Sequence, residues 1–141
     1  MVRPIVLFSV VSLGTLLLDQ ISKYFIQQYQ PDWSFSFINI IFLKNSGAGF
    51  GILPGQHILL GIISVAVIVL VAYNYQKLPK EVLPQLFAGF FLGGVMGNAL
   101  DRLLRGYVVD FISLGFWPAF NLADAAITVG AIGLIMVLWK K

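Results

Sequence analysis

The sequence lacks the residues that most metal and thiol sites require. Among its 141 residues there is no cysteine and a single histidine, His57. Without cysteine the chain has no disulfide, no thiol nucleophile and no thiolate ligand, and one histidine cannot build a zinc site alone. No serine accompanies His57 in a recognisable motif, so serine–histidine catalysis is unsupported. We therefore expect neither a metal nor a cofactor.

Charge is also scarce. Only 11% of the residues are charged and six are acidic, whereas soluble domains average about 25% charged residues. Hydrophobic residues make up 59% of the chain, and the mean hydropathy is +0.91. This composition excludes an ordinary soluble domain and indicates an integral membrane protein surrounded by lipid. The net charge of +3 is small, and we expect no nucleic-acid partner.

Four apolar segments are long enough to span a bilayer, which takes about 20 residues. They cover residues 4–26, 57–75, 83–104 and 121–139. The first has no small-residue cleavage site before Asp19, so we expect a retained helix and not a signal peptide. The sequence therefore predicts an all-α membrane protein, with residues 1–141 forming a single domain.

The distribution of cations predicts the orientation of these spans. Four spans put both termini on one side of the membrane. That side would carry five cations, Arg3, Lys77, Lys80, Lys140 and Lys141, against Lys23, Lys44, Arg102 and Arg105 on the other. Lys23 and Arg102 lie within polar motifs, and without them the bias is five against two. The positive-inside rule then places both termini in the cytoplasm and the polar clusters at the outer face.

The connection over residues 27–56 differs from an ordinary loop. Every second residue is aromatic at Trp33, Phe35 and Phe37, and a glycine-rich turn follows further along the chain. Alternation of this kind predicts one or two amphipathic strands, which would form a small aromatic cradle in the outer headgroup zone. A plain loop with an aromatic belt is the alternative.

Several polar residues stand at helix-like spacing. Asp19 and Lys23 share one helix face. They could form an ion pair that lowers the cost of membrane insertion, or they could brace a site or bind a substrate headgroup. Glycines at 89, 93 and 97 favour close helix packing. Asn98, Asp101 and Arg102 share a face at the end of the third span. They form a helix-end ion pair or position a peptide.

The KNSGAGF segment at residues 44–50 contains Asn45, Gly47, Ala48 and Phe50. One interpretation is a simple glycine-rich turn. The other is a loop whose asparagine amide and free backbone N–H groups hydrogen-bond the backbone of a substrate.

Two carboxylates bracket a short link. Asp110 is the centre of the apolar stretch VVDFI, and Asp124 follows Asn121 in a pattern that resembles a capping box. Neither a cap nor a salt bridge explains Asp110. The link, residues 111–119, turns on Gly115 and Pro118 and could bring both carboxylates together. Such a pair shares a proton, so that one member can activate water while the other protonates a carbonyl oxygen.

These motifs resemble those of lipoprotein signal peptidase, also called signal peptidase II. They are DQISK (19–23), KNSGAGF (44–50), GNALDR (97–102) with VVDF (108–111), and PAFNLAD (118–124). They occur in the family's order, and the resemblance covers essentially the whole chain. It implies an aspartyl endopeptidase of the bacterial inner membrane that removes the signal peptide from diacylglyceryl-modified prolipoproteins, cutting just before the lipidated cysteine.

The resemblance also implies residue roles. Asp110 and Asp124 would be the catalytic pair, and the substrate-contacting residues would be Asn45, Asn98, Arg102 and Asn121. Asp19, Lys23 and Gly47 would support the site, and we expect Asp101 to orient Arg102 or a helix end. Besides the substrate and membrane lipids we expect no partner, and we expect a monomer. The sequence departs from the family pattern in the link between Asp110 and Asp124, which is shorter around residues 114–117. We expect this difference to affect how the substrate enters the site.

Two other classes of protein remain as alternatives. Proton-coupled transporters also use carboxylates within the membrane. However, the acids here gather at one face, and no internal repeat of the kind common in transporters is present. A non-catalytic membrane scaffold would use the acids as caps and ion pairs, which leaves Asp110 unexplained.

Overall fold

The structure is a computed structural model that describes residues 3–48 and 52–139. Over those residues it has four helices long and apolar enough to cross a membrane. They are α1 (Pro4–Tyr29), α2 (His57–Asn74), α3 (Val82–Leu100) and α4 (Leu122–Trp139). A 3-10 turn, η2 (Tyr75–Lys77), follows α2, and a π-helical turn, η3 (Asp101–Arg105), follows α3. The predicted architecture of four spanning helices is confirmed.

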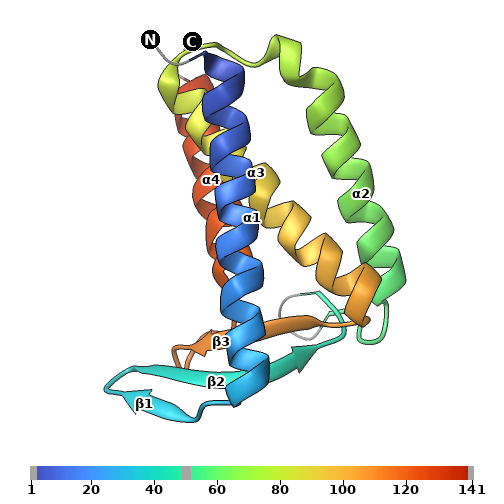
Figure 1. Ribbon diagram of the computed structural model, residues 1–141, viewed down its shortest axis with the longest axis vertical. Coiled ribbons are helices and arrows are strands. Elements are labelled where there is room, and N and C mark those ends of the chain that lie inside the picture. The colour runs from blue at the N-terminus through green and yellow to red at the C-terminus, as the bar shows by residue number, and fades with distance from the viewer. Residues whose placement is uncertain (1–2, 49–51, 140–141) are drawn as a thin grey trace.

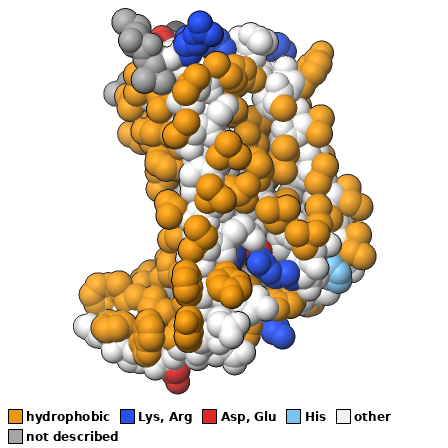
Figure 2. Space-filling view, in the orientation of Figure 1, with side chains coloured by type: hydrophobic (Ala, Val, Ile, Leu, Met, Phe, Trp, Pro, Cys, Tyr) orange, Lys and Arg blue, Asp and Glu red, His pale blue; other side chains and the backbone are white. Residues whose placement is uncertain are grey.

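Helix α3 lies at the centre of the bundle. Of its apolar stretch 61% is buried, against 6% for that of α2. Figure 1 shows α1, α3 and α4 grouped together, while α2 leans away from them toward one side. The ends of the chain lie at the end of the bundle opposite the strands. The outward faces are covered by hydrophobic side chains (Figure 2), as expected for surfaces that contact lipid.

Small residues allow the helices to approach closely. A Cβ atom added to Gly89 would come within 2.8 Å of Val11 on α1, and one added to Gly93 would come within 2.7 Å of Thr15. A Cβ on Gly97 would collide with the Asp19 carboxylate. The predicted packing role of this glycine row is therefore confirmed, with α1 as the partner helix.

A three-stranded antiparallel sheet closes one end of the bundle. Its strands, in spatial order, are β1 (Trp33–Phe35), β2 (Ile38–Asn45) and β3 (Val108–Ser113). The cradle predicted between the first two spans is present, but the third strand comes from the connection between α3 and α4. The sequence prediction missed this strand. The apolar, β-branched stretch around Asp110 pairs with the edge of β2, so its backbone N–H and C=O groups form hydrogen bonds within the sheet.

Candidate active site

Strand β3 places Asp110 beside an irregular part of the sheet. Between the pairs Ile40–Ile112 and Leu43–Asp110, two residues of β2 face one residue of β3. A β-bulge of this kind bends the strand and redirects the side chains next to it. On its other side β3 is bridged to Phe120, whose N–H donates to the Ile112 carbonyl at 3.0 Å and whose carbonyl accepts the Ile112 N–H at 2.9 Å. The bridge closes the short link and brings the start of α4 next to Asp110.

A reciprocal capping box fixes Asp124 on the first turn of α4. The Asn121 side-chain oxygen accepts the Asp124 N–H at 2.9 Å, and the Asp124 Oδ2 accepts the Asn121 N–H at 3.2 Å. The Asn121 Nδ2 also donates to Asp110 Oδ1 at 2.8 Å. The capping interpretation of this motif is therefore correct, and the same cap also links the two carboxylates.

Each oxygen of both carboxylates accepts a hydrogen bond from an asparagine. Besides the two bonds from Asn121, Asn45 Nδ2 donates to Asp110 Oδ2 at 2.9 Å, and Asn98 Nδ2 donates to Asp124 Oδ1 at 2.8 Å. The two carboxylates line one cavity of about 160 Å³, together with Asn45, Arg102 and residues 117–120. A water molecule occupies about 30 Å³ of liquid. The cavity therefore has room for water beside both acids.

The protonation of Asp110 departs from that of an ordinary aspartate. Burial, reinforced by the neighbouring charge of Asp124, raises the pKa of Asp110 to about 6. The hydrogen bonds from Asn45 and Asn121 act in the opposite direction, because they stabilise the ionised form. Asp110 therefore exchanges its proton near neutral pH, as a general acid or base must.

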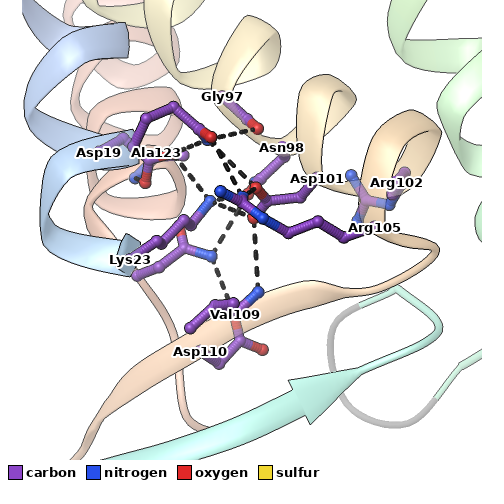
Figure 3. Close-up of polar contacts among 12 residues, drawn as sticks. Asp19, Lys23, Gly97, Asn98, Asp101, Arg102, Arg105, Val109, Asp110 and Ala123 are labelled. Carbon is purple, nitrogen blue, oxygen red and sulfur yellow. Dashed lines mark hydrogen bonds and ion pairs between the residues drawn. The ribbon is translucent and has the colours of Figure 1, made fainter. Parts of the chain in front are cut away.

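A buried ionic network supports the two carboxylates (Figure 3). Lys23 is fully buried, and its Nζ lies 2.8 Å from Asp19 Oδ2, 2.8 Å from Asp101 Oδ2 and 3.0 Å from Asn98 Oδ1. These contacts match the three donors of an ammonium group. Because Lys23 donates to the Asn98 oxygen, the Asn98 amide nitrogen is turned toward Asp124. Lys23 is too deeply buried to bind a lipid headgroup, so the structure favours the bracing interpretation of the Asp19–Lys23 pair.

Asp101 holds Arg105 and not its neighbour Arg102. One oxygen of the Asp101 carboxylate contacts Arg105, and the other pairs with Lys23 and accepts the Val109 N–H at 3.4 Å. The π-helical turn η3 carries both Asp101 and Arg105 and is followed by Gly106, which has a φ of +77°. Asp101 thus ties this turn to α1 and to β3, next to Asp110.

Arg102 lies in the wall of the cavity with spare donor capacity. Its Nη2 lies 3.5 Å from the Gly47 carbonyl, and its buried Nε has no hydrogen-bond partner among the described residues. The loop opposite is ordered by Asn45, whose oxygen accepts the Gly47 N–H at 3.0 Å. Gly47 itself is enclosed, because a Cβ there would lie 2.6 Å from the Ile52 carbonyl oxygen. Phe50 of the same motif lies outside the described residues.

The sequence interpretation did not single out three residues of this region. Gln20 donates to Asp101 and to the Gly97 carbonyl, both at 3.1 Å, and accepts from Arg105 at 3.1 Å. Its signal in the sequence is a polar amide beside Asp19 in an apolar helix. Arg105 stands four residues after Asp101, which is the spacing of a helical ion pair. Trp117 lines both the cavity of the two acids and a neighbouring apolar cavity, and its only signal in the sequence is its place in the shortened link.

The fold and the site define a class of protein. Four helices able to span a membrane, with two asparagine-held carboxylates at one end, form a membrane protein with an aspartyl-type site. The model of the family "Signal peptidase (SPase) II" matches residues 11–140.

Individual relatives agree with this match. The "Lipoprotein signal peptidase" of Moorella thermoacetica is 41% identical over 140 residues, covering 94% of this chain and 91% of the relative. That of Halothermothrix orenii is 38% identical and covers 94% of each. A solved bacterial membrane enzyme, determined in meso at 2.3 Å, is similar with a TM-score of 0.86 and 30% identity, covering 93% of this chain and 86% of that one. The chain belongs to the signal peptidase II family and is an aspartic peptidase.

Proposed function

We propose that the protein removes the signal peptide from prolipoproteins, with Asp110 and Asp124 as the catalytic pair. The relatives' name, lipoprotein signal peptidase, supports the substrate class. The observation that carries the assignment of residues is the single cavity that both carboxylates line, with every carboxylate oxygen held by an asparagine donor. The transporter alternative finds no support in these comparisons, and a scaffold leaves the cavity without a purpose.

The chemistry follows from one proton shared between the two acids. The ionised member takes a proton from water as the water oxygen attacks the carbonyl carbon of the scissile peptide bond. The protonated member donates its proton to the carbonyl oxygen, which gives a neutral tetrahedral intermediate. Collapse of the intermediate breaks the C–N bond. The amine leaves with the proton taken from water, and the other acid takes back a hydroxyl proton, which restores the starting state of the pair. Because the two carboxylates share one proton, they titrate together, and the roles of base and acid belong to the pair and not to one fixed residue.

The polar side chains around the pair divide into two roles. Asn98 and Asn121 are buried and engaged with the carboxylates, so they hold the pair in its reactive geometry. Arg102 has a buried donor without a partner among the residues that the structure describes, and it would bind a carbonyl oxygen of the substrate. Asn45 and Gly47 would position the peptide backbone from the opposite loop.

The surroundings of the cavity fit a lipidated substrate. An apolar cavity of about 480 Å³ runs from Asp124 along α4 to Val129, with Phe116 and Trp117 in its wall. It could hold an apolar part of a diacylglyceryl-modified prolipoprotein, which would be cut just before the lipidated cysteine. The exposed Trp33, Phe35 and Phe37 of the cradle would lie among the outer headgroups.

The topology follows from the same arrangement. The sheet lies at the opposite end of the bundle from the termini (Figure 1). With both termini in the cytoplasm, as the cation bias indicates, the site would face the outer side of a bacterial inner membrane. We propose that the protein works there as a monomer.

The test of the substrate class compares two forms of one prolipoprotein. Purified protein is incubated with the diacylglyceryl-modified form and, in parallel, with the unmodified form, and release of the signal peptide is followed by gel shift. We expect only the modified form to be cut. Equal cleavage of both forms would show that the lipid is not recognised. Cleavage of neither form would contradict the proposed function.

A further inference from the structure

A separate cavity lies at the end of the bundle away from Asp110 and Asp124. It has a volume of about 360 Å³ and is formed by the end of α2, the turn η2, the segment before α3, and the apolar sides of α3 and α4. Its lining includes Val71, Tyr75, Lys77, Phe91, Leu134 and Leu138. Figure 1 shows α2 and α3 closest near the sheet and farther apart toward this end. We call this cavity the inner groove.

The wall of the inner groove is fixed by a buried amide. Gln85 on α3 is fully buried. Its Oε1 accepts the Tyr75 hydroxyl hydrogen at 2.9 Å, and its Nε2 donates to the Pro79 carbonyl at 2.7 Å. These bonds hold the turn after α2 and the following loop against α3. The groove is therefore part of the ordered structure, which reduces the entropy lost when a ligand binds.

Lys77 lines the groove, and Lys80 contacts Tyr75 in its wall. The Lys77 Nζ donates to Asn74 Oδ1 at 3.0 Å, and the Lys80 Nζ lies 4.3 Å from the Tyr75 ring centroid and donates to the Tyr75 carbonyl at 3.1 Å. Both side chains are exposed, and each ammonium has three donors. Glu81 follows in the chain, so this segment carries one net positive charge. Figure 2 shows Lys and Arg atoms at this end of the molecule, as well as near the sheet.

We propose that the inner groove binds one anionic phospholipid, with an acyl chain along Phe91, Leu134 and Leu138 and the phosphate on Lys77 and Lys80. Apolar walls with cations at one end match a chain joined to a phosphate. Basic pockets between transmembrane helices bind anionic headgroups in this way. A bound lipid would fill the space between α2 and α4 and hold α2, the most exposed helix, against the rest of the bundle. The site is independent of the peptidase reaction.

The test measures lipid retention by native mass spectrometry of the full chain in a neutral detergent. Phosphatidylglycerol and phosphatidylcholine with identical acyl chains are added in equal amounts. Two variants change the groove: Lys77→Gln removes a cation, and Leu138→Trp fills the apolar part. Their matched controls are Arg3→Gln, a cation at the same end, and Ile135→Trp, on the lipid-facing side of α4. All four positions are exposed, so the fold tolerates the changes.

We expect the wild type to retain one phosphatidylglycerol in preference to phosphatidylcholine. Lys77→Gln should weaken phosphatidylglycerol binding about fivefold, the usual effect of one lysine on an anionic lipid. Leu138→Trp should weaken it at least as much, and the two controls should bind as the wild type does. Equal retention of both lipids, equal losses in Lys77→Gln and Arg3→Gln, or full binding by Leu138→Trp would each overturn the proposal. A second copy of the chain bound in place of lipid would also overturn it.

Discussion

Replacing Asn45 with alanine should change the pH at which the enzyme works. The Asn45 amide donates to Asp110 at 2.9 Å and stabilises the ionised carboxylate. Its removal therefore raises the pKa of Asp110 from its value of about 6. A hydrogen bond to a charged group contributes about 1.5–3 kcal/mol, and one pKa unit corresponds to about 1.4 kcal/mol. Water can replace part of the lost bond, so we expect a rise of about one unit.

The assay is the pH profile of kcat/KM, which reports ionisations of the free enzyme. If Asp110 serves as the acid, activity is lost as pH rises through its pKa, and the alkaline limb moves up by about one unit. If Asp110 serves as the base, the acidic limb moves up by the same amount. Ser46→Ala is the control, because Ser46 lies in the same loop and bonds Gly55 instead of a carboxylate. An active Asn45→Ala enzyme with both limbs unmoved would refute the reasoning.

Three other predictions concern stability, each read as a thermal unfolding temperature in one detergent. Gly97→Ala should lower the unfolding temperature, because the new Cβ collides with Asp19 and costs about 1–3 kcal/mol of stability. The control Gly14→Ala should leave it unchanged, because a Cβ there meets nothing within 4 Å. Equal losses in the two variants would contradict the packing argument. Lys23→Met should cost about 3–5 kcal/mol, because two buried carboxylates lose their shared cation; an unfolding temperature equal to that of the wild type would contradict this. Asp110→Asn should unfold at a higher temperature than the wild type at pH 8 and at a similar one at pH 4. The raised pKa means that wild-type stability falls as pH rises from about 4 to 6. The difference is at most about 3 kcal/mol, and a pH-independent difference would contradict this.

The spanning helices and the meeting of the two acids could be predicted because each depends on local sequence. Long apolar runs specify a membrane helix by length alone. The short link between Asp110 and Asp124, with Gly115 and Pro118 at its turn, leaves the two carboxylates little freedom to separate. The structure brings both to one cavity.

The remaining features depend on contacts between distant segments. The strand around Asp110 reads in the sequence as a short apolar run, which fits a strand or a buried helix end equally. Its pairing becomes visible only when β2 lies beside it. The contact of Gln20 with Asp101 also joins residues far apart in the chain. No local pattern encodes that contact, whereas Asp101 and Arg105 stand at the local i, i+4 spacing of a helical ion pair.

The most direct test of the proposed catalytic pair is cleavage of a diacylglyceryl-modified prolipoprotein by wild type, Asp110→Asn and Asp124→Asn. Asp32→Asn is the matched control, because Asp32 is an exposed acid just before β1. The account predicts that each catalytic variant stays folded and loses activity by about 10²–10⁴-fold, the usual contribution of a general acid or base. It also predicts that Asp32→Asn cuts at the wild-type rate. Wild-type cleavage by either Asp110→Asn or Asp124→Asn would contradict the account.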